Sequence, residues 1–192
     1  HFNEAIKGFD EAIRINPEYA VAYLIRGLAY QDLGNLSQAI QDYNQAIRLN
    51  PEYALAYNNR GTAYAFLGNP SQAIQDYNQA IRFNPEDAEV YYWNRGNAYV
   101  DLGNLSEAIQ DYNQAIRLNP KYADAYYNRG NAYLEQGEIQ KTKEDFDKAL
   151  QLEPRLKEQI DKVLKEYEQK GSIKPELKEQ GNAQPSLNTP SP

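Results

Sequence analysis

The side chains whose type and spacing could support binding chemistry in this chain are amides. Asparagine occupies one position in three successive copies of a repeated segment, as Asn59, Asn94 and Asn128, and Asn97 and Asn131 follow three residues later in two of them. Residues three apart share a helix face, so we expect a ladder of amides. Because an amide both donates and accepts hydrogen bonds, such a ladder can pair with the backbone of an extended peptide. The alternative is that the amides bond to one another along the helix stack.

The side chains that catalysis needs are scarce. The only histidine is His1 and the chain has no cysteine, so no buried histidine base and no metal site containing histidine can be assembled. Carboxylates are abundant but recur with the repeat, which is typical of a structural role. The glycines lie within or at the ends of expected helices and form no phosphate-binding loop. We therefore expect no enzyme activity, no cofactor and no metal site.

Charge and hydropathy narrow the choice of partner. The net charge of −7 argues against the phosphate backbone of a nucleic acid. No stretch approaches the roughly 18 apolar residues of a membrane span, and no signal peptide is visible. We expect a peptide or protein segment as partner, with no nucleic acid and no membrane. The compartment is left open, with a cytoplasmic location favoured.

A 34-residue unit organises the chain, and it is clearest at 51–84, PEYALAYNNRGTAYAFLGNPSQAIQDYNQAIRFN. Further copies begin at Pro17, Pro85 and Pro120. Self-similarity at one fixed period predicts a repeat array. Two segments of each unit have apolar residues at 3.6-residue spacing, which predicts two helices. Gly68 fits the left-handed position after the first helix, and Asn69 and Pro70 fit the N-cap and first turn of the second.

The spacing of small and aromatic residues in this unit carries a family resemblance. The residues are Tyr57-x3-Gly61-x2-Tyr64, then Ala73-x3-Tyr77-x2-Ala80, then Pro85. This pattern resembles the tetratricopeptide repeat, TPR, over residues 1–156. The resemblance implies an all-α, right-handed superhelical solenoid of antiparallel helix pairs. It also implies ligand binding in a concave groove, but it names no ligand.

The expected organisation is a TPR array with a capping helix over 1–170, followed by a Pro/Ser/Asn-rich tail or linker at 171–192. The parts of the array are a half repeat at 1–17, full repeats from residues 20, 54, 88 and 123, and a capping helix at 155–170.

The resemblance also indicates which side chains face the groove. By family geometry these stand two, three and six residues before the repeated glycine and one residue after it. The expected groove residues are the amides Asn59, Asn94, Asn97, Asn128 and Asn131, the aromatics Trp93 and Tyr127, and an apolar anchor formed by Leu24, Ile25 and Leu28. For the anchor residues, contact with an upstream helix is an equal alternative.

Two known modes of ligand binding by TPR proteins can be compared with the expected groove residues. The amides are similar to the asparagine ladder in the TPR region of O-linked N-acetylglucosamine transferase. The basic carboxylate clamp of chaperone-binding TPR domains needs Lys and Arg, but the equivalent places hold Asn58, Trp93, Val90 and Asp124. We therefore do not expect acidic chaperone C-termini as ligands.

The function that the sequence favours is a protein–protein interaction module that binds an extended peptide in its concave groove. The alternative is a structural spacer or self-assembling scaffold. In that case Ala5, Phe9 and Ala12 of the half repeat, or the C-terminal tail, would contact neighbouring copies.

A repeated arginine predicts an ion pair in every full repeat. Arginine replaces the apolar residue that the family usually has before the repeated glycine, and an aspartate follows 16 residues later. We expect each arginine to pair with the aspartate on the second helix of its own repeat. The pairs are Arg26 with Asp42, Arg60 with Asp76, Arg95 with Asp111, and Arg129 with Asp145.

One repeat is 35 residues long, and the extra residue is expected near Tyr91–Trp93. An added residue rotates the rest of a helix by about 100°, so it must be absorbed locally. A π-bulge between Val90 and Gly96, with Trp93 turned toward the groove, is the expected solution.

Overall fold

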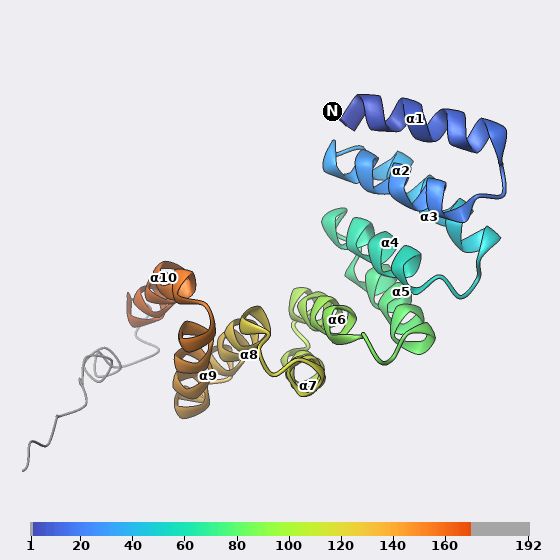
Figure 1. Ribbon diagram of the computed structural model, residues 1–192. Helices are drawn as coiled ribbons and strands as arrows, with labels where there is room; N and C mark the ends of the chain where they lie inside the picture. The colour runs from blue at the N-terminus through green and yellow to red at the C-terminus, as the bar shows by residue number, and fades with distance from the viewer. Residues whose placement is uncertain (1, 170–192) are drawn as a thin grey trace, which may run out of the picture.

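The structure is a computed structural model that describes residues 2–169, and the expected tail at 171–192 lies outside the described residues. The described chain is a succession of helices joined by short turns (Figure 1). They are α1 Phe2–Ile15, α2 Ala20–Asp32, α3 Leu36–Leu49, α4 Ala54–Phe66, α5 Pro70–Phe83, α6 Glu89–Asp101, α7 Leu105–Leu118, α8 Ala123–Glu135, α9 Ile139–Leu152, the 3-10 turn η1 Pro154–Leu156, and α10 Lys157–Gln169.

The helices form antiparallel pairs that stack along a curved path (Figure 1). The pairs are α2 with α3, α4 with α5, α6 with α7, and α8 with α9, and each second helix also packs against the first helix of the next pair. The first helices α2, α4, α6 and α8 touch one another directly. The fold is the expected all-α, right-handed superhelical solenoid, and its first helices form one continuous surface.

Small residues set the distance between the paired helices. The core contains fully buried alanines such as Ala39, Ala73 and Ala108, and aromatic rings fill the space between them. A Cβ added to Gly61 would lie 2.9 Å from Cε1 of Tyr77 and 3.1 Å from the carbonyl oxygen of Ala73. The repeated glycine is therefore required by close approach of a neighbouring ring, and its cost in helix propensity is accepted for that reason.

The turn within each pair confirms one local prediction and corrects another. Gly68 follows α4 with a φ of +72°, the left-handed conformation that ends many helices. Pro70 is the first residue of α5, and Asn69 precedes it as expected. The side chain of Asn69 makes no capping hydrogen bond, so Asn69 occupies the N-cap position without the side-chain bond that is typical of asparagine there.

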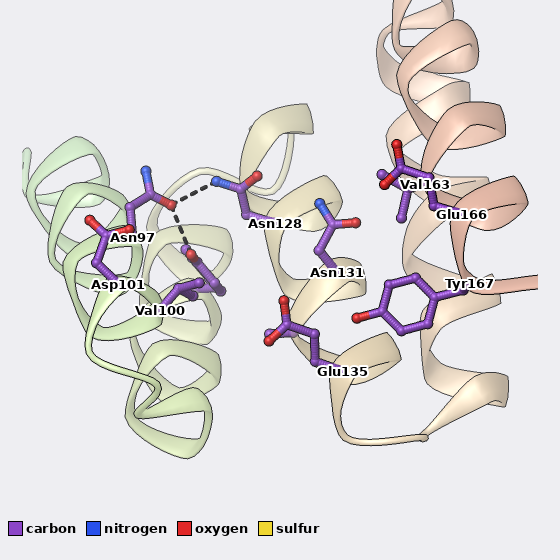
Figure 2. Close-up of a pocket in the computed structure, with 11 residues that line it drawn as sticks. Asn97, Val100, Asp101, Asn128, Asn131, Glu135, Val163, Glu166 and Tyr167 are labelled. Atoms are coloured by element: carbon purple, nitrogen blue, oxygen red, sulfur yellow. Dashed lines mark hydrogen bonds between the residues drawn. The ribbon is translucent and has the colours of Figure 1, made fainter. Parts of the chain in front are cut away.

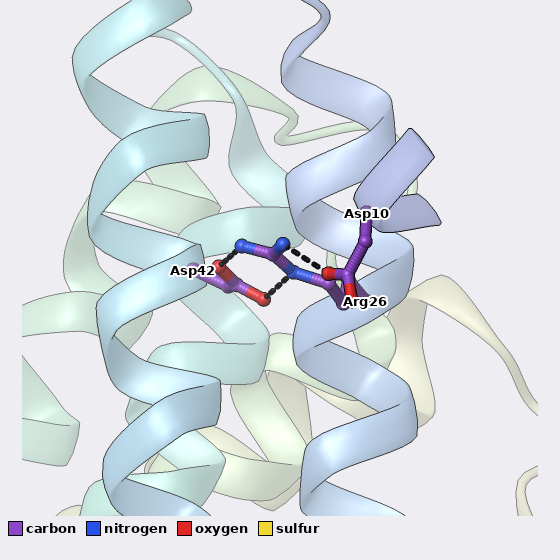
Figure 3. A network of polar contacts seen from close by, with 3 residues as sticks. All are labelled: Asp10, Arg26 and Asp42. Carbon is purple, nitrogen blue, oxygen red and sulfur yellow. Dashed lines mark hydrogen bonds and ion pairs between the residues drawn. The ribbon is translucent and has the colours of Figure 1, made fainter. Parts of the chain in front are cut away.

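The predicted arginine–aspartate pairs are confirmed in all four full repeats. Figure 3 shows the first of them, in which Nη2 and Nε of Arg26 donate to the two carboxylate oxygens of Asp42 at 2.6 and 2.8 Å. The third nitrogen of the same guanidinium, Nη1, donates to Asp10 of α1 at 2.6 Å. Each arginine thus joins its own repeat to the preceding one, a connection that the sequence analysis missed.

The extra residue of the longer repeat lies in a loop. The structure has a regular α-helix over Glu89–Asp101, and the connection before it, 84–88, is one residue longer than 50–53. The predicted π-bulge near Trp93 is therefore wrong. A loop absorbs the residue without rotating the following helix, which keeps Gly96 against Tyr112.

This insertion is accompanied by an exchange of sizes in the core. Counted back from the repeated glycine, Tyr91 stands where the preceding repeat has Ala56, and Ala88 stands where it has Tyr53. Tyr91 is 4% exposed, Ala88 is fully buried, and both belong to one core cluster. A large residue at one place and a small residue at the other keep the buried volume nearly constant, which a packed core tolerates.

The C-terminal helix α10 covers the end of the array (Figure 1). Leu156 and Ile160 are buried, and they pack in one cluster with Leu134 of α8 and with Phe146 and Ala149 of α9. Charged residues occupy the remaining faces of α10. The last repeat therefore does not expose its apolar side to water.

Candidate functional site

Four positions of each first helix form one surface. Counted from the repeated glycine, they lie six and two residues before it and one and five residues after it, which places them within about 60° on an α-helix. In chain order they are Val21, Ile25, Leu28 and Asp32; Leu55, Asn59, Thr62 and Phe66; Val90, Asn94, Asn97 and Asp101; and Asp124, Asn128, Asn131 and Glu135. We call this surface the groove face. It contains no lysine and no arginine.

Exposed apolar side chains gather in the N-terminal half of the groove face. Ile25 is 39% exposed, Leu55 is 50% exposed and Phe66 is 71% exposed. Of the three expected anchor residues, only Ile25 has an exposed side chain, because Leu24 is 5% exposed and Leu28 packs against the same core cluster. The sequence also suggests Phe66 and Ala65 as an extension of this apolar patch, and of these two Phe66 has the exposed side chain.

The amides in the middle of the groove face bond to one another. Asn94 Nδ2 donates to Asn58 Oδ1 at 2.9 Å, and Asn58 Nδ2 donates to Asn59 Oδ1 at 3.2 Å. Asn58 is 8% exposed. The sequence singled it out only because it occupies a position equivalent to one in the carboxylate clamp. It stands three residues before Gly61, where other repeats place core residues, so a buried amide joins Asn59 to Asn94.

A second amide group lies one repeat further along. Asn97 Oδ1 accepts hydrogen bonds from Asn128 Nδ2 at 2.7 Å and from the hydroxyl of Tyr112 at 2.8 Å (Figure 2). The Oδ1 atom of Asn131 is buried, with no hydrogen-bond partner among the described residues. The five expected amides therefore form two bonded groups and one unsatisfied acceptor, and bonding along the stack, the alternative stated above, accounts for part of the ladder.

A cavity of about 510 Å³ lies beside the second group (Figure 2). The first helices α6 and α8 and the capping helix α10 form it, and Tyr112 of α7 also contributes. Asn97, Asn128 and Asn131 supply amides, and Val163 and Tyr167 of α10 form the opposite wall. The sequence assigned the α10 residues to capping alone, so their part in the groove was missed.

Three carboxylates line the same cavity, Asp101 from α6, Glu135 from α8 and Glu166 from α10. None of them has an ion-pair partner among residues 2–169. Burial raises the pKa of the Tyr112 phenol, and the negative charges of Asp101, Asp111 and Glu135 raise it further. The cavity is therefore a region of negative potential.

The two expected aromatic contacts belong largely to the packing. The ring of Trp93 lies 5.8 Å from that of Tyr122, and Trp93 packs against the cluster that contains Tyr112. Its Nε1 atom is buried without a hydrogen-bond partner in the described part of the chain. The expected turn of Trp93 toward the groove therefore does not occur. Tyr127 stacks on Phe146 with ring centroids 5.9 Å apart.

The described residues also bear on metals and membranes. Within 2–169, no three residues of the types His, Cys, Asp or Glu are grouped so that they could hold a metal ion. The same part of the chain contains no helix long and apolar enough to cross a membrane.

Comparison with known sequences gives two matching family models. One is described as a TPR repeat and matches 27–68 and 96–137, and the other is described as a tetratricopeptide repeat and matches 54–87 and 123–156. Together these matches cover more than half of the chain. No protein of curated function matches the sequence significantly.

Solved structures with the same fold include structures of MamA and YrrB that are at least a quarter identical in sequence. A crystal structure of MamA is 27% identical, with a TM-score of 0.74 over 82% of this chain and 91% of its own. A crystal structure of YrrB, described as a TPR protein with an unusual peptide-binding site, is 25% identical, with a TM-score of 0.67 over 80% of this chain and 78% of its own. MamA 41-end from Desulfovibrio magneticus RS-1, at 20% identity and a TM-score of 0.73, shares the fold.

The repeat period, the helix pairs, the family matches and the solved structures agree. The chain belongs to the tetratricopeptide repeat family and is a non-catalytic protein–protein interaction module.

Proposed function

We propose that the groove face binds an extended peptide or protein segment. The observation that carries the proposal is the contrast between this face and the packing faces. The packing positions are filled by buried Ala, Gly and Tyr, whereas the groove face holds exposed apolar residues at one end and amides at the other. A surface of this kind is suited to a ligand with both apolar and backbone polar groups.

The hydrogen-bonded amides retain capacity for a ligand. Asn59 uses its Oδ1, Asn94 its Nδ2 and Asn97 its Oδ1 in the bonds described above. The second polar atom of each amide stays available, which gives a donor, an acceptor and a donor along the groove. An extended backbone presents donors and acceptors in alternation, so it can pair with this row without regard to side chains.

The bonds among the amides also favour binding. A side chain already held by a neighbour loses less rotamer freedom when it meets a ligand. Asn94 and Asn128 are fixed in this way from the preceding repeats. The likeness to YrrB, which is described as having a peptide-binding site, supports the same assignment.

Selection from a random peptide display library, with the full chain immobilised, tests the proposal. The affinity of selected peptides is then measured by calorimetry for the wild type and for Asn94→Ala/Asn128→Ala. We expect the double variant to lose about tenfold in affinity, which corresponds to one or two hydrogen bonds of ordinary strength.

The matched control is Asn35→Ala/Asn104→Ala. These asparagines precede α3 and α7, and their side chains make no capping hydrogen bond. Full affinity in the control and reduced affinity in the groove variant would support the proposal. Failure to select any peptide, or equal affinity in both variants, would contradict it.

Self-association is a second candidate function, and exposed apolar residues of α1 favour it. Ile15 is 70% exposed, Ala5 is exposed and Phe9 is half-buried. Among the described residues no other helix packs on the outer side of α1, the side that a first helix covers in the full repeats. Light scattering across a concentration series, with wild type and Phe9→Ser, tests it. A mass that rises with concentration only in the wild type would support this candidate, and a constant monomer mass would reject it.

A further inference from the structure

One row of the groove face changes character along the array. Five residues after the repeated glycine, the four repeats carry Asp32, Phe66, Asp101 and Glu135. Phe66 is 71% exposed, and the last two members line the cavity between α6, α8 and α10. The row therefore places an apolar contact on α4, between one and two repeats before a negatively charged cavity that lies between α6 and α8.

The cavity combines apolar walls with polar groups. Val100, Ala132 and Val163 supply aliphatic surface, and Asp101, Glu135 and Glu166 supply three carboxylates from three different helices (Figure 2). The buried Oδ1 atom of Asn131 adds an acceptor without a partner. All of these polar atoms accept hydrogen bonds, so the cavity lacks a charged donor.

A long cationic side chain matches both the apolar walls and the hydrogen-bond acceptors of the cavity. The aliphatic stem of lysine or arginine packs on apolar walls while its charged end meets carboxylates and amide oxygens. A metal ion does not fit as well, because the acidic residues of the described chain form no group that could hold one. An acidic ligand is repelled by the three carboxylates.

We propose that this cavity binds a lysine or arginine side chain of the segment held in the groove. The inference rests on the proposed function and adds the chemical class of the partner, a segment that carries a basic residue. Asp101, Glu135 and Glu166 are the residues that select it.

The spacing within the ligand follows from the array. Packed helices lie about 8–10 Å apart, and an extended chain advances about 3.3 Å per residue. One repeat therefore corresponds to about three ligand residues. Because the cavity lies between α6 and α8 and Phe66 ends α4, the basic residue should stand about four or five residues from an apolar one.

The display library described above tests this inference separately from the proposed function. We expect the selected peptides to be enriched in lysine or arginine about four or five positions from an apolar residue. In the best of them, replacing that lysine by norleucine, which keeps the stem and removes the charge, should weaken binding about tenfold. Asp101→Asn/Glu135→Gln/Glu166→Gln should weaken the lysine peptide to a similar degree and leave the norleucine peptide unaffected.

The matched control removes the same three charges elsewhere, in Glu52→Gln/Glu107→Gln/Glu158→Gln. These glutamates are exposed and lie outside the cavity. An equal loss of affinity in both triple variants would reduce the effect to net charge and overturn the inference. Selected peptides without basic residues would overturn it and leave peptide binding intact, whereas no selection at all would contradict peptide binding itself. If spermidine displaces bound lysine peptide at a lower concentration than the same peptide added as competitor, the cavity is assigned to a free polyamine instead.

Discussion

Arg60 and Asp76 form a two-pronged ion pair between the helices of one repeat. Nη2 and Nε of the arginine donate to the two carboxylate oxygens at 2.6 and 2.8 Å, and Nη1 donates to Asn44 of the preceding repeat at 2.6 Å. The ring of Tyr57 lies 5.5 Å from the guanidinium carbon. The hydrogen bonds that Arg60 donates to Asp76 raise the pKa of Arg60 above its ordinary value, against the effect of burial. One side chain thus connects three helices.

Removing the carboxylate should cost much more stability than removing the amide. In Asp76→Ala the guanidinium, in a side chain only 19% exposed, loses its charged partner, and we expect a loss of about 3 kcal/mol. Asn44→Ala removes one hydrogen bond at the surface and should cost about 1 kcal/mol. Urea unfolding followed by circular dichroism measures both. Equal losses in the two variants would contradict this order.

Adding one methyl group to a helix should have opposite effects at two glycines. At Gly61 an added Cβ would lie 2.9 Å from the Tyr77 ring and 3.1 Å from a backbone oxygen, so Gly61→Ala should destabilise the fold by about 1–3 kcal/mol. At Gly8 of α1 nothing lies within 4 Å, so Gly8→Ala should stabilise by up to about 1 kcal/mol through helix propensity. Thermal unfolding of both variants measures the two changes in stability. Stabilisation of Gly61→Ala would contradict the prediction, because it would show that the helices have room to separate.

The buried tyrosines should make the fold sensitive to alkaline pH. Burial raises the pKa of Tyr77 to about 12 from an ordinary value of 10.0, although the hydrogen bond with Thr62 lowers it slightly. Since the folded state holds the proton more tightly, this contribution is complete below pH 10 and is lost as the pH rises through 12. Two pKa units correspond to about 2–3 kcal/mol. Burial also raises the pKa of Tyr43 and Tyr112.

The measurement for this prediction is tyrosine absorbance and helicity along an alkaline titration. Tyr77→Phe should move unfolding to higher pH, because the group that ionises is removed. Tyr19→Phe, at a tyrosine 47% exposed, is the control and should leave the transition in place. Unfolding of all three proteins at the same pH would contradict the assignment to Tyr77.

The fold could be predicted because the same pattern of residues occurs in several successive repeats. Gly61 and Arg60 recur with the same spacing in every full repeat, and Tyr77 recurs in all but the last, where Phe146 takes its place. Each recurrence constrains the same contact. Where the pattern changes once, prediction was weaker. The extra residue occurs in one repeat only, and the sequence predicts it near Tyr91–Trp93. The sequence alone does not show that a large residue at Tyr91 and a small one at Ala88 allow the preceding loop to take the extra residue.

The candidate site could be predicted only in part. The amides were found because they recur, but their partners were not, since Asn58 occurs once and its bond to Asn94 crosses 36 residues. The cavity depends on Glu166 and Tyr167 of α10, a helix outside the repeat. Its periodicity indicated a capping role, and it carries no signal that the same helix would also form a wall of the groove.

Chemical-shift mapping of the isotopically labelled chain with a selected peptide tests the central claim most directly. The side-chain amide signals of asparagine are resolved from backbone signals and report on the groove face one residue at a time. Peptide binding in the groove predicts changes at Asn59, Asn94, Asn97 and Asn131, with the second helices α3, α5 and α7 unaffected. Changes confined to those second helices, with the asparagine signals unmoved, would contradict the claim.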